Sequence, residues 1–367
     1  MTHLKYRADI DGLRSLAIIP VVLFHAGFSS FSGGYVGVDV FFVISGYLIT
    51  SIILREQATG GFRLSEFWAR RARRILPAML FVIAAVLIAG WFFLAPIDYQ
   101  DLGRTARYQA FLSSNIYFWK SAGYFDTASE LKPLLHMWSL AVEEQFYLIF
   151  PFVCLACSLP FLKKRRIWVF LTIAVASFAY SAWFIDEKPD TIFFLSHARA
   201  WELLAGSILA SLMFDCRTSI SSLLANILAL LGLSLILGSV FFYTPNDIFP
   251  GIAALPTVLG TVLLIFSNTQ KTWVSALLSS PPLVAIGLIS YSLYLWHWPL
   301  FAYSNYMSLK EPDIQQRLLL LCASFILAYA SWRWIENPIR KMPFFKTNKR
   351  ALWATAVPQF GIAHEKA

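Results

Sequence analysis

Residues 11–28 read Asp-Gly-Leu-Arg-Ser-Leu-Ala-Ile-Ile-Pro-Val-Val-Leu-Phe-His-Ala-Gly-Phe, and this stretch sets the organisation of the chain. Ten residues separate Arg14 from His25, and eight of them are Leu, Ala, Ile, Val or Phe. In a helix, these eleven steps end roughly 20° beyond three turns and about 16 Å along the axis, so Arg14 and His25 share a face. An imidazole in an apolar span faces a bundle interior or a wet cavity and marks a functional site. The alternative is a structural histidine bonded to a neighbouring carbonyl.

The composition is that of a polytopic membrane protein. The 367 residues are 58% hydrophobic and only 14% charged, with a mean hydropathy of +0.61, whereas soluble domains are about 25% charged. The net charge of +9 comes from clustered Arg and Lys, which favours cytoplasmic loops and contact with anionic membrane lipid over nucleic-acid binding. Cys154 and Cys157 lie in an apolar run without metal-ligating neighbours, so we expect no metal site.

Ten apolar segments are long enough to span a membrane, which predicts an all-α polytopic helix bundle. They cover residues 11–28, 35–54, 75–96, 138–161, 167–185, 193–214, 219–243, 250–267, 281–306 and 316–335. Basic clusters at 55–74, 163–166 and 340–350 are cytoplasmic by the positive-inside rule, which places both termini inside. An eleventh span within 97–137 would place the basic cluster 163–166 on the outer side. We therefore interpret 97–137 as an outer amphipathic or re-entrant segment.

Several carboxylates are expected at the depth of His25, in the outer half of the bundle. Asp39 follows a Gly-rich hairpin, and a carboxylate beside an imidazole fixes its tautomer and supports it as a general base. Glu143 and Glu144 lie inside the fourth segment, where adjacent carboxylates point about 100° apart and therefore meet different partners. The alternatives are a helix-capping role for Asp39 and a buried ion-pair knot for the two glutamates.

Two further outer-half features have a structural alternative. His297 and Trp298 end the ninth segment beside Pro299, and their aromatic surroundings suit either a sugar-stacking surface or an interfacial belt. Arg199 and Glu202 are three residues apart at the start of the sixth segment, and we expect them to pair within their helix.

The run Arg70-Arg-Ala-Arg-Arg74 is the strongest charge feature of the inner side. Arg71 and Arg74 are three residues apart and share a helical face, so their guanidinium groups can converge on one phosphate group. Charge that only sets the topology is the alternative.

These stretches together resemble the acyltransferase-3 family of integral membrane O-acyltransferases. The matching residues are 10–17 with His25, 37–49, 70–77, 138–147, 294–299 and 334–340. The resemblance covers residues 7–341 and implies a domain of about ten helices that takes an acyl group, usually acetyl, from coenzyme A. It further implies an acceptor hydroxyl on a cell-envelope or exported carbohydrate such as lipopolysaccharide or another polysaccharide, and it marks the pairs Arg14 with His25 and Arg71 with Arg74 as functional.

We therefore expect a bacterial inner-membrane O-acetyltransferase that moves acetyl across the membrane from acetyl-CoA to a carbohydrate or lipid-linked glycan. His25, Asp39, Glu143 and Glu144 are the expected catalytic residues. Arg14, Arg71 and Arg74 are expected to bind coenzyme A, and His297 and Trp298 the acceptor. The rival function is a proton-coupled transporter or flippase, because buried His, Glu and Arg also occur in carriers.

The expected domain boundary falls at residue 341. Residues 350–357 look like the start of the eleventh helix after which many bacterial relatives continue into an extracytoplasmic SGNH-type domain. We expect 342–367 to be a short cytoplasmic tail or the start of such a helix, and an SGNH-type partner to be a separate protein.

Overall fold

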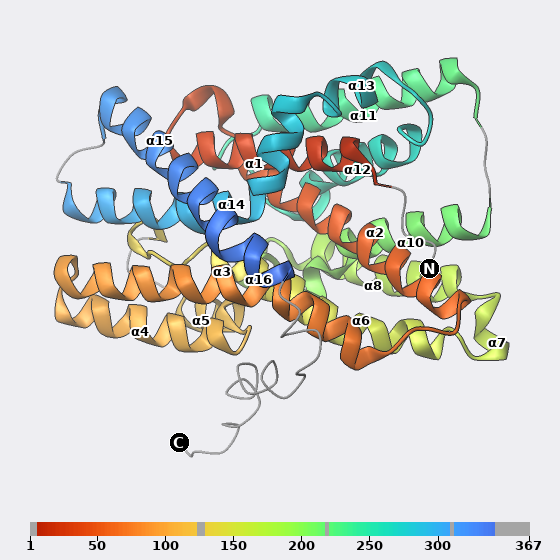
Figure 1. Ribbon diagram of the computed structural model, residues 1–367, viewed down its shortest axis with the longest axis horizontal. Helices are drawn as coiled ribbons and strands as arrows, with labels where there is room; N and C mark the ends of the chain where they lie inside the picture. The colour runs from red at the N-terminus through yellow and green to blue at the C-terminus, as the bar shows by residue number, and fades with distance from the viewer. Residues whose placement is uncertain (1–5, 123–128, 217–219, 309–311, 342–367) are drawn as a thin grey trace. The chain divides into compact units, whose positions relative to one another are not determined.

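The computed structural model describes residues 6–122, 129–216, 220–308 and 312–341, and this part of the chain is helical without any strand (Figure 1). The all-α prediction is therefore confirmed. The expected tail, 342–367, lies outside the described residues.

A helix occupies each of the ten expected segments. They are α1 (Ala8–His25), α2 (Gly37–Ala58), α3 (Leu64–Phe93), α6 (Met137–Ala156), α8 (Arg166–Phe184), α10 (Ser196–Asp215), α11 (Ser222–Phe242), α12 (Leu255–Ser267), α14 (Pro281–Met307) and α15 (Ile314–Ser331). Seven helices in the described ranges are long and apolar enough to cross a membrane. Of the ten, α1, α10 and α12 are not among these seven, since α1 and α10 carry several ionisable residues and α12 has only 13 residues.

The expected outer segment, 97–137, contains α4 (Pro96–Ala110), α5 (Ser114–Ser121) and the short turn η3 (Ser129–Leu131). Pro96 occupies the first turn of α4, where its missing N–H costs no hydrogen bond. None of the three meets the length and hydropathy that a span requires, within the residues that could be assessed. The prediction that 97–137 adds no span is confirmed to this extent.

The chain divides into two compact units. Unit 1 comprises Met1–Phe62 and Phe146–Ser290, and unit 2 comprises Arg63–Gln145 and Tyr291–Ala367. In unit 1, α10 packs along α2 and α8, while α1 contacts α2 and the short helix α13 (Trp273–Leu278). Glycine allows the closest of these approaches: a Cβ at Gly46 would collide with the Leu203 carbonyl, and one at Gly206 with the Val43 carbonyl. Because of this contact, polar side chains of α2 and α10 can pair directly.

In unit 2, α3 packs against α4 and against the C-terminal turns η5 (Trp332–Glu336) and α16 (Asn337–Lys341). Helix α3 begins at Leu64, eleven residues before the predicted start at 75. The arginine run therefore lies in the helix, as the shared helical face of Arg71 and Arg74 requires, although the predicted third segment begins only after it. Tyr303 Oη donates a hydrogen bond to the Val86 carbonyl and fastens α14 to α3.

Candidate functional site

Helix α1 is anchored at its N-terminal end by ion pairs in unit 1. Arg7 pairs with Asp9 at 2.5 Å and also donates to the Ile265 carbonyl at 3.1 Å. Arg14 pairs with Asp11 at 3.3 Å, and Asp11 accepts a second hydrogen bond from Tyr6 at 2.8 Å. The two aspartates in the first turn also complement the helix dipole. Arg14 thus lies in the expected helix, half-buried, with a carboxylate beside it.

Arg14 and His25 lie in one helix, as predicted, with Pro20 inside it and His25 as its last residue. The level of Asp39 differs from the prediction. A Cβ at Gly37, two residues before Asp39, would collide with the Ala17 carbonyl, so the start of α2 lies against Ala17. Since Ala17 is eight residues before His25, or about 12 Å along the helix, Asp39 lies well below the half-buried His25.

The partner of Asp39 is Arg199. The two side chains pair at 2.7 Å between Nη2 and Oδ1, and Arg199 Nε lies 2.9 Å from Glu202 Oε1. All three side chains are at most 1% exposed, and the guanidinium lies 5.5 Å from the centre of the Phe42 ring and 5.6 Å from that of Phe249. The predicted Arg199–Glu202 pair is confirmed. The expectation of Asp39 beside an imidazole is corrected, because the cation that neutralises it comes from α10. We call Asp39, Arg199 and Glu202 the buried trio.

A second charged group lies in unit 2, where α3 and α6 bring arginines and glutamates together. The carboxylate of Glu144 is 8% exposed and interacts electrostatically with Arg71, Arg74 and Glu143. Its Oε1 atom accepts no hydrogen bond from the described residues. Arg71, Arg74 and Glu143 are half-buried. Sequence counting separated these arginines and glutamates between the two halves of the membrane, whereas the structure groups them.

Two more elements of unit 2 complete this group. Tyr291 of α14 donates to the Ile75 carbonyl of α3 at 2.8 Å and interacts electrostatically with Glu144, Glu336 and Arg74. Ser292, the next residue, donates to Glu336 Oε2 at 3.0 Å, and both are buried. We define the arginine–carboxylate cluster by residues Arg71, Arg74, Glu143, Glu144, Tyr291 and Glu336. It presents two guanidinium groups at a half-buried position, with carboxylates near them.

Two buried imidazoles occupy another part of unit 2. The rings of His136 and His297 are 5.7 Å apart between centroids and at most 4% exposed. His297 Nδ1 lies 2.8 Å from the Tyr294 carbonyl and 3.1 Å from that of Leu293, so a neutral ring carries its proton there and keeps Nε2 as the acceptor nitrogen. Tyr294 Oη donates to the His136 carbonyl at 2.8 Å and lies 2.6 Å from Ser139 Oγ.

The predicted acceptor residues are therefore interior ones. Trp298 is 9% exposed and its indole donates to the Lys132 carbonyl at 2.7 Å, while His297 is completely buried. Helix α14 continues through Pro299 to Met307. Contact of His297 and Trp298 with an acceptor stays a prediction.

Sequence reasoning missed three members of these groups. Tyr291 and Glu336 are far from α3 in the sequence, and no local spacing indicates that they meet it. His136 appeared only as part of a longer stretch. The partner of Asp39 was detectable in principle, because a carboxylate inside an apolar helix needs a cation from another helix, but Arg199 appeared satisfied by Glu202.

Comparisons with known proteins find a matching family and relatives along almost the whole chain. The family model described as "Acyltransferase domain" matches residues 7–333. The peptidoglycan O-acetyltransferase OatA of Listeria monocytogenes is 33% identical over 371 residues, which cover 95% of this chain and 59% of that protein. The O-acetyltransferase OatA of Staphylococcus aureus is 33% identical over 369 residues, covering 96% of this chain and 61% of that protein. The chain thus spans about 60% of the length of these relatives. No solved structure matches it.

Proposed function

Because this chain belongs to the acyltransferase family whose domain occupies residues 7–333, we propose that it is a membrane O-acetyltransferase of a cell-wall carbohydrate. The donor is acetyl-CoA and the acceptor is a hydroxyl group of a glycan. The observation that carries this proposal is the similarity, over at least 95% of the chain, to relatives named for O-acetyl transfer, one of them to peptidoglycan. The several helices able to span a membrane make the chain a multi-pass membrane protein.

Arg71 and Arg74 are proposed to bind the phosphates of coenzyme A. They lie one helical turn apart on α3, and planar guanidinium groups bind phosphate oxygens in a bidentate manner. The neighbouring carboxylate of Glu144 interacts with both electrostatically. Arg14 is a third proposed contact, although Asp11 already offsets part of its charge.

His25 is proposed to act on the thioester. As a base, it takes the proton of the acceptor hydroxyl while the oxygen attacks the acetyl carbon and the thiolate of coenzyme A leaves. As a nucleophile, it forms an acetyl-imidazole, releases the same thiolate and then passes acetyl to the hydroxyl. Both routes need an imidazole that the thioester can reach, and His25 is half-buried. Glu143 and Glu144 are the proposed carboxylates of the reaction, and Asp39 is proposed to support the site from within the buried trio.

The acceptor is proposed to be modified outside a bacterial cytoplasmic membrane, with both chain termini inside. The support is the distribution of basic residues at 55–74 and 163–166. A separate SGNH-type protein is a proposed partner for the last transfer step, and lipid-linked glycan is a possible form of the acceptor.

Sealed vesicles with the cytoplasmic face outward test the function and its direction. Radiolabelled acetyl-CoA is added outside, and cell-wall glycan is either enclosed in the lumen or supplied outside. We expect ester-linked label on enclosed glycan only. Label on external glycan would contradict the direction, and uptake of glycan without any label would support a transporter.

A further inference from the structure

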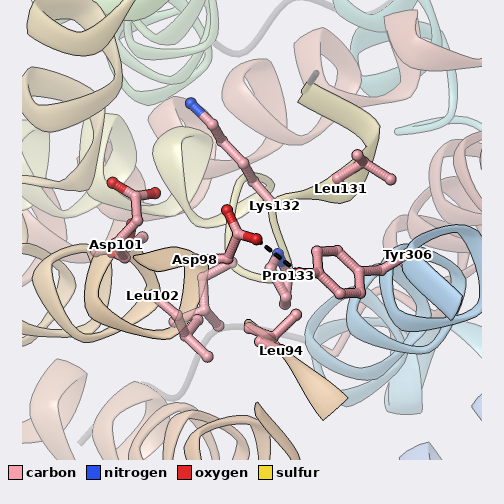
Figure 2. A pocket seen from close by; sticks show the side chains of 10 residues that line it. Leu94, Asp98, Asp101, Leu102, Leu131, Lys132, Pro133 and Tyr306 are labelled. Atoms are coloured by element: carbon pink, nitrogen blue, oxygen red, sulfur yellow. Dashed lines mark hydrogen bonds between the residues drawn. The ribbon is translucent and has the colours of Figure 1, made fainter. Parts of the chain in front are cut away.

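A small pocket in unit 2 lies between α4, the segment 131–134 and the end of α14. Its polar lining consists of Asp98, Asp101 and Thr105 from α4, Lys132 from the segment, and Tyr306 from α14, with leucine side chains around them (Figure 2). Asp98 and Asp101 are three residues apart and share one helical face. The pocket is part of the region that sequence analysis places on the outer side, and neither the catalytic nor the donor-binding role uses it.

Each carboxylate of the pocket keeps one oxygen for a ligand. Asp98 Oδ2 accepts a hydrogen bond from Tyr306 at 2.6 Å, and Asp101 Oδ1 accepts one from Tyr117. Within the described part of the chain, the second oxygen of each group receives no hydrogen bond. Burial, followed by the bond to Asp101, raises the pKa of Tyr117, so its hydroxyl stays a donor and holds Asp101 in place.

Lys132 also lines the pocket. Its side chain is 7% exposed, and its ammonium group lies 5.8 Å from the centre of the Phe118 ring. The main chain at Lys132 is also fixed, since its carbonyl accepts the indole N–H of Trp298 at 2.7 Å. Trp298 is the neighbour of His297 in α14, so the main chain of the pocket is hydrogen-bonded to the residue next to the buried histidine pair.

These groups favour a neutral ligand rich in hydroxyl groups. Two carboxylates disfavour a phosphate or an acidic peptide. A metal ion is disfavoured as well, because the described residues contain no cluster of three His, Cys, Asp or Glu. Sugar hydroxyls can donate to both carboxylates, and charge-assisted hydrogen bonds of this kind are the stronger ones.

We propose that the pocket formed by Asp98, Asp101 and Lys132 is a binding subsite for a sugar unit of the acceptor glycan. The proposal rests on the proposed function and adds to it where the carbohydrate is recognised. The carboxylates act as positioning residues for the acceptor and take no part in binding acetyl-CoA.

The test compares Asp98→Asn and Asp101→Asn, separately and together, with wild-type protein in native membranes. Asparagine keeps an oxygen for the tyrosine but removes the charge and one acceptor, so folding is preserved. Glycan isolated from cells that lack the gene is titrated at saturating labelled acetyl-CoA, and the donor is titrated at fixed glycan. Asp186→Asn is the matched control, since Asp186 is an exposed carboxylate outside the pocket.

We expect each pocket substitution to raise the KM for glycan about tenfold, as the loss of a charged hydrogen bond does, and to leave the KM for acetyl-CoA within about twofold. The Asp186 variant should match wild type. An unchanged KM for glycan, or equal changes for donor and glycan, would overturn the subsite while leaving the O-acetyltransferase function intact. Wild-type membranes that label no glycan would overturn the proposed function and the subsite together.

Discussion

The buried trio of unit 1 and the arginine–carboxylate cluster of unit 2 combine the same residue types in different surroundings. Arg199, Asp39 and Glu202 are at most 1% exposed and bonded to one another. Arg71 and Arg74 are half-buried and interact with carboxylates electrostatically. A fully buried ion pair in an apolar bundle is costly to break, because the charge that remains is buried without a partner or water. A half-buried arginine pair can receive a ligand. The first arrangement holds helices together and the second fits a binding site.

Replacing Arg199 should give the largest effect. Arg199→Met leaves Asp39 and Glu202 as two buried carboxylates without a cation, and breaking a buried pair costs about 3–5 kcal/mol. We expect little monodisperse protein after detergent extraction, measured by size-exclusion chromatography.

Two companion variants separate charge from packing. Arg63→Met removes an exposed pair, in which Arg63 is 73% exposed, and should leave the yield unchanged. Adding Asp39→Asn and Glu202→Gln to Arg199→Met removes the unpaired charges and should restore part of the yield. Normal yield of Arg199→Met alone would show that the trio is dispensable for the fold.

Replacing His25 should affect activity and not folding, although His25 belongs to the same unit as the buried trio. His25→Ala truncates a half-buried side chain at the end of α1, so the yield should be near normal. Acetyl transfer should fall on the order of a hundredfold or more, as expected when a base or nucleophile is lost. The assay is label transfer from acetyl-CoA to glycan.

His197→Ala is the matched control for His25. This histidine is also in unit 1 but is exposed, and its ring contacts that of Tyr180 in a tilted arrangement with 5.0 Å between the centroids. The His197→Ala variant should transfer acetyl at the wild-type rate. Near-normal turnover of His25→Ala would favour the structural interpretation of His25.

The arginine pair should affect donor binding more than turnover. Arg71→Ala combined with Arg74→Ala should raise the KM for acetyl-CoA about tenfold and lower kcat less, because the charges bind the remote phosphates. Lysine at both positions should restore binding only in part, since the bidentate fork is lost.

Arg73→Ala serves as the control for this pair. It removes one positive charge from the same helix, but Arg73 Nε donates to the Ala69 carbonyl of its own helix at 3.1 Å. Its KM should stay near that of wild type. Equal KM values for all of these variants would leave the arginines with a role in membrane topology only.

These contrasts also explain what the sequence could predict. Apolar length located every one of the ten main helices, and three-residue spacing found the Arg199–Glu202 pair, because both depend on local periodicity. The partner of Asp39 and the meeting of Tyr291 with α3 depend on which helices pack together. Helical periodicity predicts on which face of its helix a residue lies, but it does not predict which other helix packs against that face. The predicted start of the third helix was wrong because the charged arginine run is not apolar, so apolar length alone does not count it as part of the helix. In the structure, α3 includes the run.

The smallest effect should come from replacing Tyr291, which connects α14 to α3 by a single hydrogen bond. Tyr291→Phe keeps the ring and removes the bond to the Ile75 carbonyl, which is 2.8 Å long. The carbonyl belongs to the residue after Arg74, so the bond steadies the helix at the proposed phosphate contact. A neutral hydrogen bond contributes about 1 kcal/mol, and the thermal midpoint in detergent should fall by about 2–4 °C. The KM for acetyl-CoA should rise by less than about threefold, because both guanidinium groups remain. A tenfold rise with an unchanged midpoint would mean that the tyrosine hydroxyl contacts the donor itself.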